Sequence, residues 1–113
     1  MYNVKTVCLD FDGLFNDYTG WKGKESLGKP KEGIKEFLYE LNRKFDRIII
    51  ETSRDRLEVA VWLKKHELGR YIINIYDKKP KATVYIDDRA IRFNGDFKKT
   101  LKELNSLKPY WEK

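Results

Sequence analysis

The sequence predicts an α/β fold, a three-layer α/β/α arrangement in which helices cover a short parallel sheet. Short apolar runs rich in β-branched residues alternate with segments of helical periodicity, which is the pattern of parallel strands joined by helices. Polar residues follow directly after three of these runs, at the sheet edge where proteins of this class form their sites. The 113 residues contain no internal repeat and no Ser- or Pro-rich linker, so residues 1–113 are expected to form a single domain.

The first predicted strand and helix lie in the N-terminal part of the chain. VKTVCLDF (4–11) is rich in β-branched residues and nearly all apolar toward its end, which predicts a strand. KPKEGIKEFLYELNRKF (29–45) predicts a helix that begins near Pro30. Its apolar residues keep the i, i+3, i+4, i+7 spacing of a buried helical face: Ile34, Phe37, Leu38 and Leu41.

The next strand and helix follow in the middle of the chain. DRIIIET (46–52) is a short continuous apolar run, which is typical of a strand buried on both faces. A helix is predicted over residues 54–67, closed by Gly69 at a C-cap position. The residues expected along its inward stripe are Leu57, Ala60, Val61 and Lys64.

The C-terminal part predicts two strands and a last helix. YIINIY (71–76) and TVYID (83–87) are the strands, separated by a charged segment that contains proline. The helix covers residues 97–107, and Pro109 ends it. The side chains expected to face inward are Phe97, Leu101 and Leu104, with Tyr110 and Trp111 packing back on the body.

The composition is that of a globular chain with a densely charged surface, since 41% of the residues are hydrophobic and 37% are charged. The net charge of +6 favours anionic partners, which include nucleic acid and phosphorylated metabolites.

No apolar run has the length of a membrane span, so no membrane partner is expected. A single cysteine, Cys8, excludes an internal disulfide and fits a cytoplasmic location. With one cysteine and one histidine, a Cys/His zinc cage is excluded.

Carboxylates dominate the polar residues that follow the predicted strands. These polar residues are Asp10 and Asp12, then Thr52 and Ser53, then Asp87 and Asp88. Four aspartates at one sheet edge repel one another unless a cation neutralises them, and oxygen ligands of this kind suit Mg²⁺. Asp10 and Asp12 point to the same side of an extended chain, so one can touch a metal while the other acts as acid or base. Asp12-Gly13 alone would be an ordinary turn, but the second acidic pair favours a site.

The ordered set of these segments resembles a known family. LDFDG, then IIIETSR, then KKPKATVYIDDR are similar to the successive signatures of the haloacid dehalogenase (HAD) superfamily of phosphotransferases. VYIDDRAIRF is especially like the small members of that superfamily that lack a cap domain. The resemblance implies a Rossmann-like (HAD-like) fold without a cap. It also implies a Mg²⁺-dependent phosphatase, a phosphoric monoester hydrolase that works through an aspartyl-phosphate intermediate.

The resemblance also implies roles for individual residues. Asp10 would be the nucleophile, and Asp12 would protonate the leaving oxygen and then activate water. Thr52 would hydrogen-bond the transferring phosphoryl group, and Lys79 would neutralise its charge. Asp87 would complete the Mg²⁺ shell with the Asp10 carboxylate and the main-chain carbonyl of Asp12.

Four further residues have more than one interpretation. Asp88 would act through a water or help to position the metal. Ser53 would replace Thr52 in the phosphate contact or cap the following helix. Arg54 and Arg89 would bind substrate phosphates or pair with nearby aspartates.

Two other features leave alternatives open. Lys78 and Lys81 flank Lys79, so the sequence leaves the register of the catalytic lysine unsettled. Tyr18 and Trp21 lie where this family carries a flap over the site, and they would stack on a base or sugar or pack within the flap.

The spacing of the signatures limits the substrates. About forty residues separate Asp12 from Thr52, which leaves no room for a cap domain. Capless members act on large or exposed phosphate esters or borrow enclosure from a neighbouring subunit, so a homo-oligomer is one alternative. The expected partner is a phosphorylated substrate, either a small molecule or a nucleic-acid end. Two other functions stay open. One is a nucleic-acid end phosphatase, suggested by the charge of +6, and the other is a non-catalytic HAD-like binding or regulatory domain.

Overall fold

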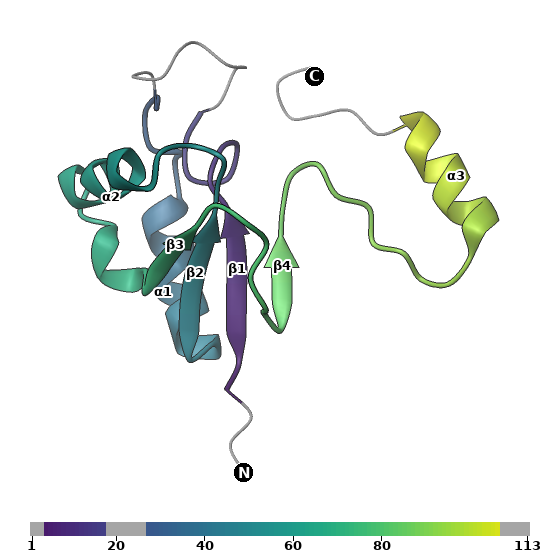
Figure 1. Cartoon of the computed structure of the whole chain (residues 1–113), viewed down its shortest axis with the longest axis horizontal. Helices are drawn as coiled ribbons and strands as arrows, with labels where there is room; N and C mark the ends of the chain where they lie inside the picture. The colour runs from purple at the N-terminus through teal and green to yellow at the C-terminus, as the bar shows by residue number, and fades with distance from the viewer. Residues whose placement is uncertain (1–3, 18–26, 107–113) are drawn as a thin grey trace.

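The computed structural model describes residues 4–17 and 27–106. Figure 1 shows a twisted sheet with helices beside it. The elements in chain order are β1 (Thr6–Asp10), α1 (Ile34–Lys44), β2 (Arg47–Glu51), α2 (Arg56–Lys65), the 3₁₀ helix η1 (Gly69–Tyr71), β3 (Asn74–Tyr76), β4 (Val84–Ile86) and α3 (Phe97–Ser106). The four strands form one all-parallel sheet of order β3-β2-β1-β4. The predicted α/β class with a short parallel sheet is therefore confirmed, and it is consistent with a three-layer, Rossmann-like fold.

The order of the strands reverses at β1. The chain moves from β1 to β2 and β3 on one side, and then returns to place β4 on the other side of β1. Cys8 of β1 accordingly aligns with both Ile49 of β2 and Tyr85 of β4. Such a switch point opens a crevice at the carboxyl ends of the strands. Asp10 ends β1 and Asp87 directly follows β4, so both residues lie at this crevice.

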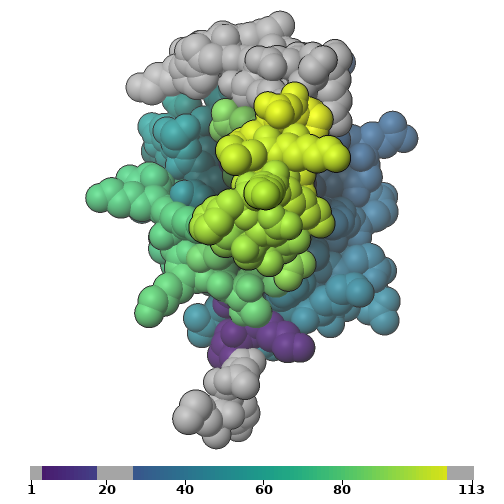
Figure 2. All heavy atoms as spheres, turned by 90° about the vertical axis from the view of Figure 1, so that its right-hand side faces the viewer, coloured from purple at the N-terminus to yellow at the C-terminus, as the bar shows by residue number. Residues whose placement is uncertain are grey.

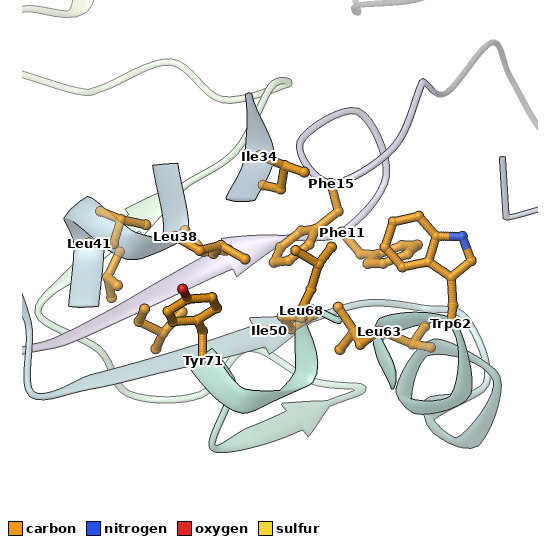
Figure 3. Close-up of a cluster of buried hydrophobic side chains, with 14 residues drawn as sticks. Phe11, Phe15, Ile34, Leu38, Leu41, Ile50, Trp62, Leu63, Leu68 and Tyr71 are labelled. Atoms are coloured by element: carbon orange, nitrogen blue, oxygen red, sulfur yellow. The ribbon is translucent and has the colours of Figure 1, made fainter. Parts of the chain in front are cut away.

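The hydrophobic core lies between the sheet and the helices α1 and α2, whose buried side chains join one cluster (Figure 3). Its fully or nearly buried members are Val7, Leu9, Phe11, Phe15, Ile34, Leu38, Leu41, Ile48, Ile50, Val59, Trp62, Leu63, Leu68 and Tyr71. Phe11 stacks on Phe15 with 5.5 Å between ring centroids, and it meets the edge of Trp62 at 5.1 Å. This aromatic group packs the turn that follows β1 against α2.

The helix α1 begins at Ile34, later than the predicted start near Pro30. Pro30 instead pairs with Asn16 in an isolated antiparallel bridge, and Lys31 N donates to the carbonyl of Phe15 at 2.8 Å. The segment that was expected to begin the helix is thus held against the turn after β1. The buried residues of α1 are Ile34, Leu38 and Leu41, which confirms the predicted spacing apart from Phe37.

The predicted inward stripe of the second helix is wrong. Leu57 and Val61 are 72% and 60% exposed, and the buried residues of α2 are Val59, Trp62 and Leu63. Trp62 explains this phase, because its large ring packs on Phe11 and its indole Nε1 donates to the Gly28 carbonyl at 3.0 Å. Trp62, which has the largest side chain of α2 and an indole N–H that needs an acceptor, therefore determines which face of α2 is buried.

The predicted C-cap at Gly69 is also wrong. His66 is the C-cap of α2, and Glu67 has the left-handed backbone conformation, with φ of 60°. Gly69 instead begins η1. The chain reverses two residues earlier than a glycine signal indicates, because the backbone N–H of Leu68 donates to the Leu63 carbonyl at 2.8 Å.

The last helix has the predicted position but not the predicted packing. Phe97, Leu101 and Leu104 are 76%, 63% and 52% exposed, and α3 buries no side chain. Figure 1 shows α3 beyond the β4 edge of the sheet, and Figure 2 views the molecule from that side, with α3 in yellow in front of the body. Helical periodicity predicted an apolar stripe correctly, but the segment 87–96 carries that stripe away from the core.

Some predictions concern residues outside the described part of the chain. These are the flap residues Tyr18 and Trp21, the end of the last helix at Pro109, and the packing of Tyr110 and Trp111. Within residues 4–17 and 27–106, no helix combines the length and apolarity that a membrane crossing requires.

Candidate active site

Three carboxylates meet at the switch point of the sheet. Asp10 ends β1, and Asp87 and Asp88 follow β4, which is the direct neighbour of β1. One oxygen from each of the three carboxylates lies within 4.8 Å of the others. We call Asp10, Asp87 and Asp88 the acidic cluster. Residues that are almost eighty positions apart in the sequence thus form one group through strand pairing.

The oxygens of the acidic cluster fit a divalent cation. Among the described residues, no hydrogen-bond donor reaches the buried Oδ2 of Asp10 or the two buried carboxylate oxygens of Asp88. Leaving a buried acceptor unpaired costs about 1–3 kcal/mol, and more when the group is charged. Several carboxylate oxygens without nitrogen or sulfur ligands are the donor set of Mg²⁺ or Ca²⁺. The residues present therefore suit the metal that the sequence predicted.

Proximity and burial change the acidity of this cluster. The pKa of Asp10 is raised from 3.8 to about 7, first by burial and then by the charges of Asp87 and Asp88, while the charge of Arg89 acts in the opposite direction. The pKa of Asp88 is also raised, first by burial and then by Asp87. Both shifts express the cost of gathering negative charge in a partly buried place, which a bound cation relieves.

Gly13 makes room for the Asp88 carboxylate. Its φ is +87°, and a Cβ placed on it would lie 2.4 Å from Asp88 Oδ2. The sequence indicated only that Gly13 allows a sharp turn. In the structure it does so, and it also lets a carboxylate from another segment lie directly against the backbone after β1.

The Asp12 side chain has different partners from those of the acidic cluster. The guanidinium Nε of Arg54 donates to its Oδ1 and Oδ2 at 3.0 and 2.9 Å. The carboxamide of Asn16 donates to Oδ1 at 2.9 Å. Of the two interpretations of Arg54, pairing with an aspartate is the one observed. Asp10 and Asp12, which are two residues apart, therefore enter distinct environments.

Asn16 belongs to the site, although no motif in the sequence marks it. It is buried, and its Nδ2 also donates to the Leu27 carbonyl at 2.6 Å, while its Oδ1 accepts from Gly13 N at 2.8 Å. The available signal was its position four residues after Asp12, within reach of a one-turn contact. No pattern in one sequence shows that this asparagine is buried.

Thr52 is buried at the end of β2, and its hydroxyl is oriented by the backbone. Its Oγ1 accepts a hydrogen bond from Arg54 N at 3.1 Å. The hydroxyl proton can then be donated elsewhere, as a phosphate contact requires. Ser53 is exposed, and it does not cap the following helix as one interpretation held. Asp55 is the N-cap, with its carboxylate accepting from Leu57 N at 2.9 Å.

The Lys79 ammonium lies over the ring of Tyr85, 4.6 Å from its centroid. Its charge lowers the pKa of Cys8, whereas Arg89 is the cation that lowers the pKa of Asp10. The backbone N–H of Arg89 also donates to Asp87 Oδ1 at 2.9 Å. The structure therefore associates Arg89 with the acidic cluster and Lys79 with Tyr85. The role of Lys79 stays a prediction.

A groove on the described surface lies apart from the acidic cluster. A groove of about 640 Å³ runs between α2 and β3, and its lining includes Leu57, Ile73 and Ile75. None of its residues belongs to the cluster. Asp87 is exposed.

The fold and the acidic cluster together define an α/β protein with a candidate metal site at the switch point of its sheet. No protein-family model matches the chain, and no curated protein matches it. A solved structure, described as that of a conserved protein from Bacteroides thetaiotaomicron, is similar with a TM-score of 0.60 and 21% sequence identity. The match covers 96% of this chain and 95% of that one. At this identity the likeness shows the fold alone.

Proposed function

We propose that this protein is a Mg²⁺-dependent phosphatase that hydrolyses phosphoric monoesters through an aspartyl-phosphate on Asp10. The observation that carries the proposal is the acidic cluster at the switch point, with oxygens of Asp10 and Asp88 buried and without a donor among the described residues. Clustered charge of this kind is costly in a fold that does not use it. The resemblance of LDFDG, IIIETSR and VYIDDR to the HAD signatures gives the same chemistry.

The proposed reaction has two steps. A carboxylate oxygen of Asp10 attacks phosphorus while the bond to the ester oxygen breaks, and Asp12 gives its proton to the departing alcohol. A water then attacks the phosphorus of the aspartyl-phosphate, and Asp12 takes a proton from that water. Inorganic phosphate leaves, and the Asp10 carboxylate is restored. The hydroxyl of Thr52 donates to the phosphoryl group in both steps, which its hydrogen bond from Arg54 N allows.

The carboxylates of Asp10, Asp87 and Asp88 would hold Mg²⁺ together with the main-chain carbonyl of Asp12. When bound, the ion would neutralise the charge of the carboxylates and of the phosphoryl group that approaches them. Lys79 is the proposed cation for the transferred group. Arg89, whose charge already lowers the pKa of Asp10, is the second candidate for that role.

The short spacing between Asp12 and Thr52, which leaves no room for a cap domain, supports an exposed phosphate ester as substrate. The phosphate terminus of a nucleic acid is the second candidate, favoured by the net charge of +6. A basic protein that neutralises several backbone phosphates loses affinity steeply as salt rises, whereas a small ester shows no such slope. Cytoplasmic location is proposed with the phosphatase, because the chain has a single cysteine, which is buried and free.

The test is a screen of phosphate esters and phosphorylated oligonucleotides with Mg²⁺, using wild type, Asp10→Asn and Asp77→Asn. Asp77 is the matched control, because it also directly follows a strand but lies outside the acidic cluster. We expect Asp10→Asn to fold and to lose turnover, and Asp77→Asn to keep it. Full activity in Asp10→Asn would refute the nucleophile assignment. A wild type that hydrolyses nothing in the screen but captures a partner would favour the non-catalytic binding domain.

A further inference from the structure

The Asp12 carboxylate is held by two buried side chains, those of Arg54 and Asn16. The Arg54 side chain is 3% exposed and that of Asp12 is 19% exposed, with 2.9 Å between Nε and Oδ2. Asn16, which lies in the turn after β1, donates to Oδ1 at 2.9 Å. Arg54 follows β2, so the grip on Asp12 depends on the pairing of β1 with β2.

The two carboxylate oxygens of Asp12 are not equivalent. Oδ1 accepts from both Arg54 Nε and Asn16 Nδ2, whereas Oδ2 accepts from Arg54 Nε. The single Nε–H of Arg54 is shared between the two oxygens, so among the described residues Oδ1, which also accepts from Asn16, is more fully occupied than Oδ2. Oδ2 is therefore the oxygen with the greater capacity to exchange a proton with a leaving group or a water.

Asn16 is itself fixed by contacts that leave it no freedom to turn. Its Oδ1 accepts from Gly13 N at 2.8 Å, and its Nδ2 donates to the Leu27 carbonyl at 2.6 Å as well as to Asp12. A flipped carboxamide would place Nδ2 against the Gly13 donor and Oδ1 against two acceptors. Hydrogen bonds to the backbone of Gly13 and Leu27 thus set the orientation of the Asn16 carboxamide, and this carboxamide in turn orients the Asp12 carboxylate.

Arg54 also connects Asp12 with Thr52. Its backbone N–H donates to Thr52 Oγ1 at 3.1 Å, and its side chain holds Asp12. One residue therefore orients both the proposed acid–base group and the proposed phosphate-binding hydroxyl. A buried arginine and carboxylate pair is weak evidence for stability, because desolvation offsets much of the attraction. The contacts of Arg54 with Asp12 and Thr52 instead explain the buried pair by the positions that it gives to these two side chains.

We propose that Arg54 and Asn16 are positioning residues that hold Asp12 so that Oδ2 transfers the proton in each step, a role that rests on the proposed phosphatase function. A misplacement of about 1 Å costs on the order of 10²-fold in rate. Removing the hydrogen bonds of either Arg54 or Asn16 to Asp12 should therefore lower the rate of proton transfer while the acidic cluster stays intact. Neither Arg54 nor Asn16 needs to touch the substrate.

The variants that test this are Arg54→Lys, Arg54→Gln and Asn16→Ala, with Arg56→Lys as the matched control. Arg56 is the exposed first residue of α2 and is two positions from Arg54. Lysine keeps the charge but lacks the planar guanidinium, so Arg54→Lys separates charge from orientation. We expect kcat to fall on the order of 10²-fold in Arg54→Lys, with Mg²⁺ affinity and KM nearly unchanged. Arg56→Lys should match the wild type.

A comparison of leaving groups distinguishes positioning from a general loss of structure. Nitrophenolate leaves without a proton, whereas an alkoxide needs one. The fall in kcat/KM should therefore be much larger for an alkyl phosphate than for 4-nitrophenyl phosphate. A purely structural defect lowers both values by the same factor. The unfolding transition of each variant, followed by circular dichroism, confirms that the folded protein is being compared.

The decisive measurement is a double-mutant cycle with Asp12→Asn. If Arg54 acts through Asp12, Arg54→Lys should cause no further loss of kcat in the Asp12→Asn background. An equal loss in both backgrounds, or wild-type kcat in folded Arg54→Lys, Arg54→Gln and Asn16→Ala, would overturn the positioning role alone. Absence of turnover in the wild type would instead overturn the proposed function, and the positioning role with it.

Discussion

Gly13 and Asp88 share one corner of the acidic cluster, since a Cβ on Gly13 would lie 2.4 Å from Asp88 Oδ2. The backbone after β1 and the carboxylate after β4 can approach this closely only because position 13 lacks a side chain. The absence of a side chain at Gly13 therefore determines the position of the Asp88 carboxylate.

Gly13→Ala should weaken Mg²⁺ binding by displacing Asp88 from the cluster. We expect the affinity to fall about 10- to 100-fold, as for other changes beside metal ligands, measured by isothermal titration calorimetry. Gly33→Ala is the control, because Gly33 has a similar φ of +89° but no atom within 4 Å of an added Cβ. Both variants should lose roughly 1–2 kcal/mol from left-handed strain. Equal Mg²⁺ affinities would show that the contact with Asp88 is unimportant.

The stability of the metal-free protein should fall as pH rises from about 4 to 7. The folded state raises the pKa of Asp10 from 3.8 to about 7, so in this range it keeps a proton that the unfolded state has lost. Mg²⁺ should reverse the trend, since it favours the ionised carboxylate, and should raise Tm more at pH 8 than at pH 5. Thermal unfolding in EDTA and in Mg²⁺ measures both effects. Asp10→Asn should flatten them, and a variant with the same pH dependence as wild type would contradict the assignment.

Cys8 should resist alkylation in the native protein. Burial, followed by the nearby charges of Glu51 and Asp10, raises the pKa of its thiol to about 11, so the reactive thiolate is scarce at neutral pH. We expect iodoacetamide to label Cys8 at a rate set by unfolding, and to label it fully in urea. Mass spectrometry after timed quenching follows the reaction. Rapid labelling without denaturant would mean that the centre of the sheet opens readily.

The core and the α3 stripe should contribute very differently to stability. Leu38 is fully buried in α1, so Leu38→Ala should lower the free energy of unfolding by about 2–5 kcal/mol. Leu101 is exposed on α3, so Leu101→Ala should change it by no more than about 0.5 kcal/mol. Urea denaturation measures both variants. A large loss in Leu101→Ala would mean that α3 packs against the body of the protein in solution.

Strand ends are the feature that one sequence predicts well here. An apolar run that stops at a carboxylate marks both a buried strand and its end, because a charge is costly to bury wherever the strand lies. Asp10, Thr52 and Asp87 were therefore expected at one sheet edge, and the structure brings them to the ends of β1, β2 and β4. The parallel pairing that this required follows from the alternation of strands and helices.

Side-chain partners were beyond the reach of the sequence. Asp10 and Asp12 looked equivalent by alternation, yet one joins Asp88 in the acidic cluster and the other joins Arg54. The partner of each carboxylate comes from a different strand end. Nothing local to the DFDG segment specifies which arginine or aspartate will lie beside it. Asn16 was missed for the same reason, since its burial depends on the return of the chain at Leu27.

For the last helix, too, the sequence predicted the local structure but not the packing. The periodicity of residues 97–106 determined a helix with an apolar stripe, because hydrogen bonding within the helix and the order of side chains along it are local properties. Whether that stripe meets a core depends on the path of residues 87–96, which is not a local property, and in the structure the stripe stays exposed. The sequence by itself thus determined the fold class, the strand ends and the residue types at the site. Only the tertiary structure decided which of those residues touch, because contacts between distant segments depend on strand pairing and on competition for space in the core.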